Sequence, residues 1–168
     1  MSKAFTRESD DDLDDAASRP LGPELPPGVR NYMTPRGAAL LREKLAELRE
    51  VERPAALGAS DGRALHEIDR KLAFLERRLE EGEVVDPATQ PPGRARFGAT
   101  VVVSSEGGDE RRYRLVGIDE ADPARGDVSW LSPVAKALLG AEAGDLVTLR
   151  TPRGSEELEV VRVTYEAG

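Results

Sequence analysis

The chain has 168 residues, with 24 basic and 32 acidic side chains, one histidine and no cysteine. A formal net charge of −8 argues against a grip on duplex DNA, which rewards basic surfaces. Without cysteine there are no disulfides and no thiolate chemistry, and no apolar run approaches the roughly 20 residues that span a bilayer. We therefore expect a soluble cytoplasmic protein, without a membrane partner, that binds another protein.

The first segment, residues 1–31, is acidic and then rich in proline. Like charges between Glu8 and Asp15 repel one another, and the four prolines from Pro20 to Pro27 prevent a helix. We expect a disordered tail here, which is either a solvated segment or an acidic tether for a basic partner.

Residues 32–82 carry two helical patterns that together predict an antiparallel coiled-coil hairpin. In each pattern the apolar side chains recur at steps of three and four residues, which places them on one narrow seam. The seams consist of Ala38, Leu41, Leu45 and Leu48 in the first helix and Leu65, Ile68, Leu72, Leu75 and Leu79 in the second. A turn at residues 58–62 makes each seam the nearest partner of the other.

Start and stop signals delimit these two helices. Thr34-Pro35 fits an N-cap followed by a first helical position, and Arg53-Pro54 predicts a bend or an end. The second helix should begin within residues 61–64 and end near Glu81, with Gly82 in a left-handed conformation after it.

A proline-rich linker at residues 83–96 predicts a domain boundary, followed by a second domain at residues 97–168. Ser132-Pro133 starts a short helix in this domain. Short β-like runs lie at residues 99–104, 112–118, 128–131, 146–150 and 158–165. The last run alternates, with Leu158, Val160, Arg162 and Thr164 on one face. Five strands around one short helix predict a small α+β domain.

Residue types that serve ordinary catalysis are scarce. His66 is the one histidine, so a zinc site or a nucleophile–base dyad is poorly supported. Asp119, Glu120 and Asp122 form an acidic cluster between turn residues. We interpret this cluster as a solvated loop rather than a metal site.

Several short motifs follow one another along the chain. They are Tyr32-Met33-Thr34-Pro35-Arg36-Gly37, Arg53-Pro54, Ile68-Asp69-Arg70, Val84-Val85-Asp86-Pro87, the segment 126–139, Gly144-Asp145 and Thr151-Pro152-Arg153-Gly154. In this order they resemble the Gre family of bacterial transcription elongation factors, most of all its GreB branch. The resemblance covers about residues 31–165.

This resemblance implies a coiled coil joined to an FKBP-like α+β domain, in a monomer that is not itself an enzyme. It implies RNA polymerase, within a transcription elongation complex, as the partner: the body docks at the rim of the secondary channel and the coiled coil extends down that channel. In the docking unit, Ser132, Pro133 and Lys136 match the family. Leu131 stands where members often have an acid.

The tip departs from the family pattern. Members that stimulate transcript cleavage carry an Asp-x-x-Glu pair there, which helps to hold the Mg²⁺ of the polymerase active site. In this chain the turn follows Pro54 almost at once, and Asp61 and Glu67 are the acids near it. Six positions apart, they would lie on different helical faces. We therefore expect no cofactor of the protein's own and a channel-binding regulator without efficient cleavage stimulation.

Three alternatives stay open. The first is cleavage stimulation through a divergent tip. The second is a prolyl isomerase on the FKBP-like domain, an activity that the fold alone does not imply; its aromatic candidates are Phe97, Tyr113, Trp130 and Tyr165. The third is a homodimer in which short helical arms bundle with one another.

Overall fold

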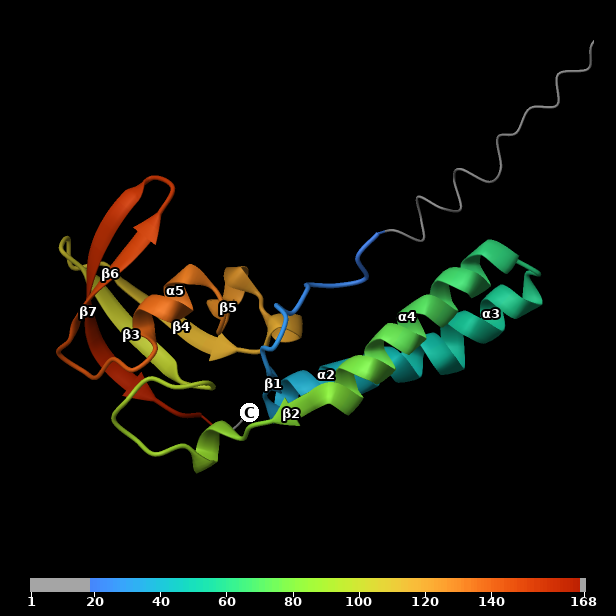
Figure 1. The fold of residues 1–168 in the computed structure, drawn as a ribbon, viewed down its shortest axis with the longest axis horizontal. Helices are drawn as coiled ribbons and strands as arrows, with labels where there is room; N and C mark the ends of the chain where they lie inside the picture. The colour runs from blue at the N-terminus through green and yellow to red at the C-terminus, as the bar shows by residue number, and fades with distance from the viewer. Residues whose placement is uncertain (1–18, 167–168) are drawn as a thin grey trace, which may run out of the picture.

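The computed structural model describes residues 19–166, as a helical N-terminal region followed by a β-sheet domain (Figure 1). This confirms the predicted order of a helical part and then a part rich in strands. The first eighteen residues of the predicted tail lie outside the described residues. The helical region contains β1 (Asn31–Met33), α2 (Pro35–Glu47), the π-helical turn η1 (Leu48–Glu52), α3 (Arg53–Gly58), α4 (Gly62–Glu81) and β2 (Gly82–Val84).

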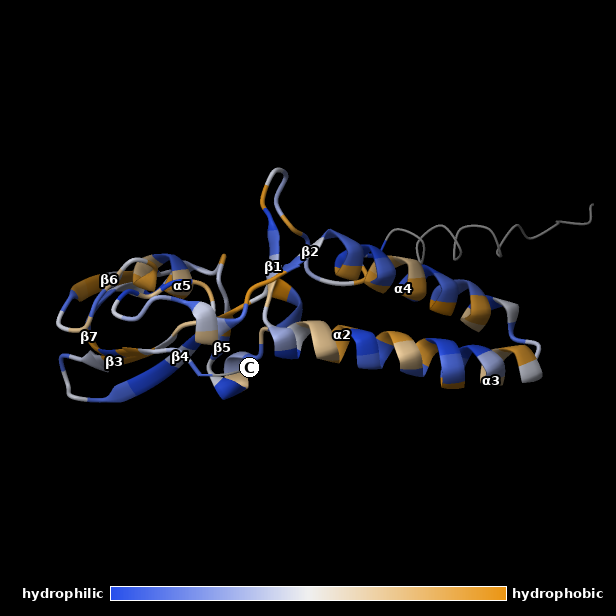
Figure 2. Cartoon of the chain, turned by 90° about the horizontal axis from the view of Figure 1, so that it is seen from below, coloured by the Kyte–Doolittle hydropathy of each residue, from blue (hydrophilic) through white to orange (hydrophobic). Residues whose placement is uncertain are grey.

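Two helical arms make up most of this region and lie side by side (Figure 2). The first arm is α2, η1 and α3, and the second is α4, which contacts all three. The predicted seams face each other: Ala38, Leu41, Leu48, Ile68, Leu72 and Leu75 are buried in one apolar cluster, and Leu45, Leu65 and Leu79 pack against it half-buried. Within residues 19–166, no helix combines the length and the apolar character that crossing a membrane requires.

Pro54 does not end the first arm. Proline has no N–H to donate to the carbonyl four residues earlier. The chain widens just before it, so that the Arg53 N–H donates to the Leu48 carbonyl across the five-residue turn η1. Such single-turn π-bulges absorb a local defect without breaking the helix. The arm then continues through α3 to Gly58.

Gly82 follows α4 in an extended conformation, with φ −77° and ψ 135°. The predicted left-handed cap at this residue is therefore wrong. Gly82 instead pairs with Asn31 in a parallel ladder between β1 and β2, which the sequence pattern did not indicate. A Cβ at this position would come 2.8 Å from the backbone carbonyl oxygen of Arg78, so this close approach favours glycine.

The second domain is built on a five-stranded sheet in the order β5-β4-β3-β7-β6. Its elements are β3 (Thr100–Ser105), β4 (Glu110–Val116), the 3-10 turns η3 (Ile118–Glu120) and η4 (Pro123–Arg125), β5 (Asp127–Ser129), α5 (Pro133–Leu138), β6 (Leu146–Thr151) and β7 (Gly154–Thr164). β4 and β5 pair in parallel and the other pairs are antiparallel. A further 3-10 turn, η2 (Pro87–Thr89), lies in the predicted linker. Helix α5 packs its buried Ala135 and Leu138 into the core of the sheet.

In the last strand, β7, side chains do not alternate regularly between the two faces of the sheet along its whole length. Leu158 and Val160 point into the core, but the register with β3 shifts at Val161, which is 41% exposed. A β-bulge of this kind moves every later side chain to the other face. Val163 and Tyr165 therefore pack on the core, and the predicted shared face of Val160 and Arg162 is wrong.

The two parts of the molecule are joined through the acidic turn η3. Both oxygens of Glu120 lie at the start of α2: the Thr34 N–H donates to Oε1 at 3.0 Å, and the Thr34 hydroxyl donates to Oε2 at 2.6 Å. The same hydroxyl accepts from the Gly37 N–H at 3.0 Å, as an N-cap does. The prediction of a solvated loop at residues 119–122 is therefore wrong for Glu120, because this carboxylate completes a helix N-terminus. It is also wrong for Asp119, whose side chain is only 11% exposed.

Two ion pairs accompany this contact. Arg36 lies 3.3 Å from the buried Asp127, and Arg78 of α4 lies 3.6 Å from Asp119. The side chains of Arg78 and Asp119 are each only 11% exposed. Burial raises the pKa of Asp119; the charge of Arg78 opposes this and that of Glu120 adds to it. Each arm is thus tied to the sheet domain by its own charged contact.

Residues 19–30 have no regular secondary structure and lie along α4. The Pro23 carbonyl accepts a hydrogen bond from Arg78 Nη2. Gly22 lies against the Phe74 ring, where an added Cβ would come 2.9 Å from Cζ. This part of the predicted tail therefore covers the base of the second arm.

Glu120→Ala should lower the free energy of unfolding by about 3 kcal/mol, because it leaves the N–H groups of Thr34 and Gly117 without their charged acceptor. Glu120→Gln keeps one acceptor oxygen and should lose much less. Urea denaturation of the three proteins measures this. Equal stability of wild type and the alanine variant would contradict the capping role.

The raised pKa of Asp119 predicts a pH effect of definite sign. The folded state binds the proton of the Asp119 carboxyl group more tightly than the unfolded state does. The stability gained from this proton is lost as the pH rises above the ordinary Asp pKa of about 4. The wild type should therefore lose stability relative to Asp119→Asn over this range, until Asp119 ionises in the folded state too. Denaturation curves at a series of pH values show the slope, and a slope of the opposite sign would mean that Arg78 outweighs burial.

Candidate functional site

The tip of the arms is the tight turn between α3 and α4. Ser60 adopts a left-handed conformation there, with φ 55°. Asp61 follows as the N-cap of α4, and its carboxylate accepts from the Ala64 N–H at 3.0 Å. A residue predicted as a candidate tip acid therefore already stabilises the start of a helix, although it stays exposed.

The other candidate acid, Glu67, lies along α4 and not in the turn. It pairs with Lys71 at 3.0 Å, one helical turn further on. This hydrogen bond and the charge of Lys71 hold the pKa of Glu67 below its usual value. The carboxylates of Asp61 and Glu67 thus have different partners, and neither is directed at a shared point.

A third acid near the tip joins the two arms. Asp69 accepts from Arg53 Nε at 2.7 Å, and this contact lowers the pKa of the carboxyl group. Among residues 19–166, no group of three or more Asp, Glu or His side chains comes together as a metal site would need. The acids near the tip therefore serve helix capping and ion pairing.

The docking segment predicted at Leu131–Lys136 forms the start of α5. Ser132 is its N-cap, and its hydroxyl accepts from the Ala135 N–H at 3.2 Å. Pro133 and Lys136 are exposed, whereas Leu131 and Ser132 are half-buried. The structure thus presents a proline and a lysine to solvent on a segment whose conformation the serine fixes.

Three aromatic rings meet beside this segment, and the sequence did not indicate that they would. Tyr32 of β1 lies 5.2 Å from Trp130 and 5.6 Å from Phe97, measured between ring centroids. Phe97 and Trp130 meet edge to face at 6.3 Å. Their positions are 33 and more residues apart along the chain, so no local pattern signals the contact. We call these three residues the aromatic junction.

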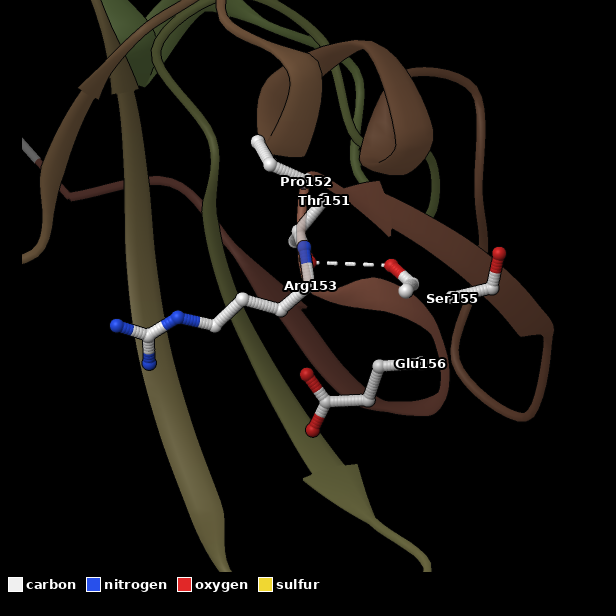
Figure 3. A pocket seen from close by; sticks show the side chains of 6 residues that line it. Thr151, Pro152, Arg153, Ser155 and Glu156 are labelled. Carbon is white, nitrogen blue, oxygen red and sulfur yellow. Dashed lines mark hydrogen bonds between the residues drawn. The ribbon is translucent and has the colours of Figure 1, made fainter.

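A surface hollow of about 480 Å³ lies at the turn between β6 and β7 (Figure 3). Six successive residues, 151–156, line it. The Thr151 hydroxyl donates to the Gly154 carbonyl at 3.0 Å and accepts from the Arg153 N–H at 3.3 Å, which closes the turn. The motif Thr151–Gly154 is thus explained by turn geometry.

Comparison with known proteins gives the family. The family model for the C-terminal part of the GreA/GreB transcription elongation factors matches residues 90–165. Transcription elongation factor GreB of Neisseria meningitidis serogroup B is 40% identical over 155 residues, covering 82% of this chain and 95% of that protein. GreA of Alkalilimnicola ehrlichii is 40% identical over 152 residues, covering 79% and 96%.

Among solved structures, a GreA/GreB factor from Nitrosomonas europaea is 28% identical with a TM-score of 0.41, covering 81% of this chain and all of that one. The sequence relationships show that this chain belongs to the GreA/GreB family of transcription elongation factors.

Asp61→Ala should lower the free energy of unfolding by about 1 kcal/mol through loss of the N-cap of α4. Asp61→Asn removes the charge but keeps a capping oxygen, so it should lower the free energy of unfolding by only a few tenths of a kcal/mol. Thermal or urea denaturation compares them. If both variants were as stable as the wild type, Asp61 would be a free carboxylate and not a cap.

Proposed function

We propose that this protein binds RNA polymerase as a monomeric Gre-type regulator and works on elongation complexes in the cytoplasm. The sheet domain, which we take to be FKBP-like, docks at the rim of the secondary channel. The two arms enter the channel as a coiled coil. Family membership and the pairing of the two arms along buried seams support this proposal.

The arms are short for this purpose. α4 has 20 residues, which corresponds to about 30 Å of helix. The alignment with GreB of Neisseria meningitidis is 155 positions long, but 82% of 168 residues is only about 138. About 17 positions of that relative therefore have no counterpart in this chain. We infer from the early turn after Pro54 that these positions belong to the two arms, whose reach is then shorter than in that relative.

The observation that best supports the proposal is that the acidic side chains near the tip are already engaged in contacts within the protein. A Mg²⁺ ion needs oxygen ligands at about 2.0–2.1 Å, so two carboxylates must converge to hold it. Here Asp61 caps a helix and Glu67 pairs with Lys71. We infer that the protein occupies the channel without stimulating transcript cleavage efficiently, and so competes with factors that do.

Docking would use the exposed part of the segment 131–136. Pro133 and Lys136 offer an apolar edge and a positive charge to the polymerase, while Ser132 holds the backbone. Leu131 is half-buried, so it adds an apolar rim and no negative charge. Prolyl isomerase activity has no comparable support, because Phe97 and Trp130 direct their rings at Tyr32.

Transcript cleavage in backtracked elongation complexes tests this function. The protein alone should release no more RNA than polymerase does by itself, and when added to a cleavage-stimulating relative it should reduce that factor's effect as its concentration rises. Robust cleavage by the wild type that vanishes in Asp61→Asn, which keeps the helix cap, would contradict the inference about the tip. Lack of competition together with lack of binding to purified polymerase would contradict the whole proposal.

A further inference from the structure

Trp130 connects the docking segment to the base of the arms. Its backbone N–H donates to the Val116 carbonyl at 2.9 Å, which anchors it to the end of β4. The next residues turn back on Ser129: the Leu131 N–H donates to the Ser129 hydroxyl at 3.2 Å, and the Ser132 N–H donates to the Ser129 carbonyl at 2.8 Å. The position of Trp130 therefore determines where the docking segment begins.

The indole ring contacts Tyr32, which lies in the strand at the base of the arms. Tyr32 lies in β1, directly before the buried Met33 and the N-cap Thr34. β1 pairs with β2, the strand that directly follows α4 at the base of the arms. Tyr32 is therefore connected to the first arm through the chain and to the second arm through this pairing. The contact between the Tyr32 and Trp130 rings thus joins the base of the arms to the segment that starts α5.

The contact is apolar in kind. Trp130 Nε1 is buried and has no hydrogen-bond partner, although indole N–H groups usually find one when buried. The ring is therefore held at this place by its packing against Tyr32 and Phe97, and not by a polar anchor. A phenylalanine would keep the packing and lose no hydrogen bond.

We propose that Trp130 is a positioning residue for polymerase binding, which couples the docking segment to the direction of the arms through the aromatic junction. This inference rests on the proposed function. Glu120 and Arg78 tie the arms to the turn η3, but the aromatic junction is the contact that reaches the docking segment. Once the docking segment has bound the polymerase, the aromatic junction holds the arms in one orientation. Arms that already point along the channel can enter it without first sampling other orientations.

The absence of cysteine allows a direct measurement of this coupling in the full chain. Ala59→Cys at the tip and Glu106→Cys in the turn after β3 replace exposed residues, and spin labels there report the distance between tip and body. Tyr32→Ala and Trp130→Ala should broaden the distance distribution and weaken competition for the channel about tenfold. Trp130→Phe should keep both the narrow distance distribution and the competition for the channel close to those of the wild type.

Two matched variants separate coupling from other effects. Tyr113→Ala removes an aromatic ring that packs on the sheet core, outside the junction, and should leave the distances narrow. Lys136→Glu should weaken docking while the distances also stay narrow. Tyr32 lies outside the sheet domain, so Tyr32→Ala changes none of that domain's own residues and keeps the test decisive if Trp130→Ala does not fold.

The outcomes of this experiment are distinct. If the wild type binds polymerase and the distances and competition are unchanged in Tyr32→Ala, the coupling is contradicted and the proposed function stands. If the wild type does not bind polymerase, the proposed function fails, and this inference, which rests on it, fails with it. Broadened distances with weakened competition, both restored by Trp130→Phe, support the positioning role.

Discussion

The structure depends on one carboxylate. Glu120 belongs to the sheet domain, yet its two oxygens accept from Thr34 at the start of the first arm. Helix N-termini leave N–H groups without partners and carry partial positive charge, so an acid is stabilising there. Gly37 makes the approach fit, because a Cβ on it would come 2.5 Å from the Glu120 carboxyl group. This contact holds the base of the first arm against the sheet domain, and the ion pair of Arg78 with Asp119 does the same for the second arm.

Beyond the Glu120 contact, the two arms are stabilised by the apolar seam between them. They end in a turn whose acid, Asp61, caps α4. A short pair of helices with a capped tip can fill a channel but brings no converging carboxylates to a metal ion. The proposed activity is therefore one of shape and position. In this proposal the polymerase supplies the chemistry at the active site, and the protein contributes the direction and the length of its arms.

Much of the fold could be predicted from local pattern. The period of the two seams, the caps at Thr34 and Ser132 and the short β-like runs all depend on residues close together in the chain, and each is found in the structure. The parts that could not be predicted are contacts over long separations. The pairing of β1 with β2, the acceptor role of Glu120 and the aromatic junction leave no periodic trace. The bulge at Val161 was missed because alternation assumes an unbroken ladder.

Electron cryomicroscopy of the protein bound to a polymerase elongation complex tests the central claim most directly. The account predicts density for both arms inside the secondary channel, the start of α5 against the rim, and a tip that stops short of the active-site metal with Asp61 still capping α4. Arms lying outside the channel, or carboxylates of Asp61 and Glu67 turned together toward the metal, would contradict it.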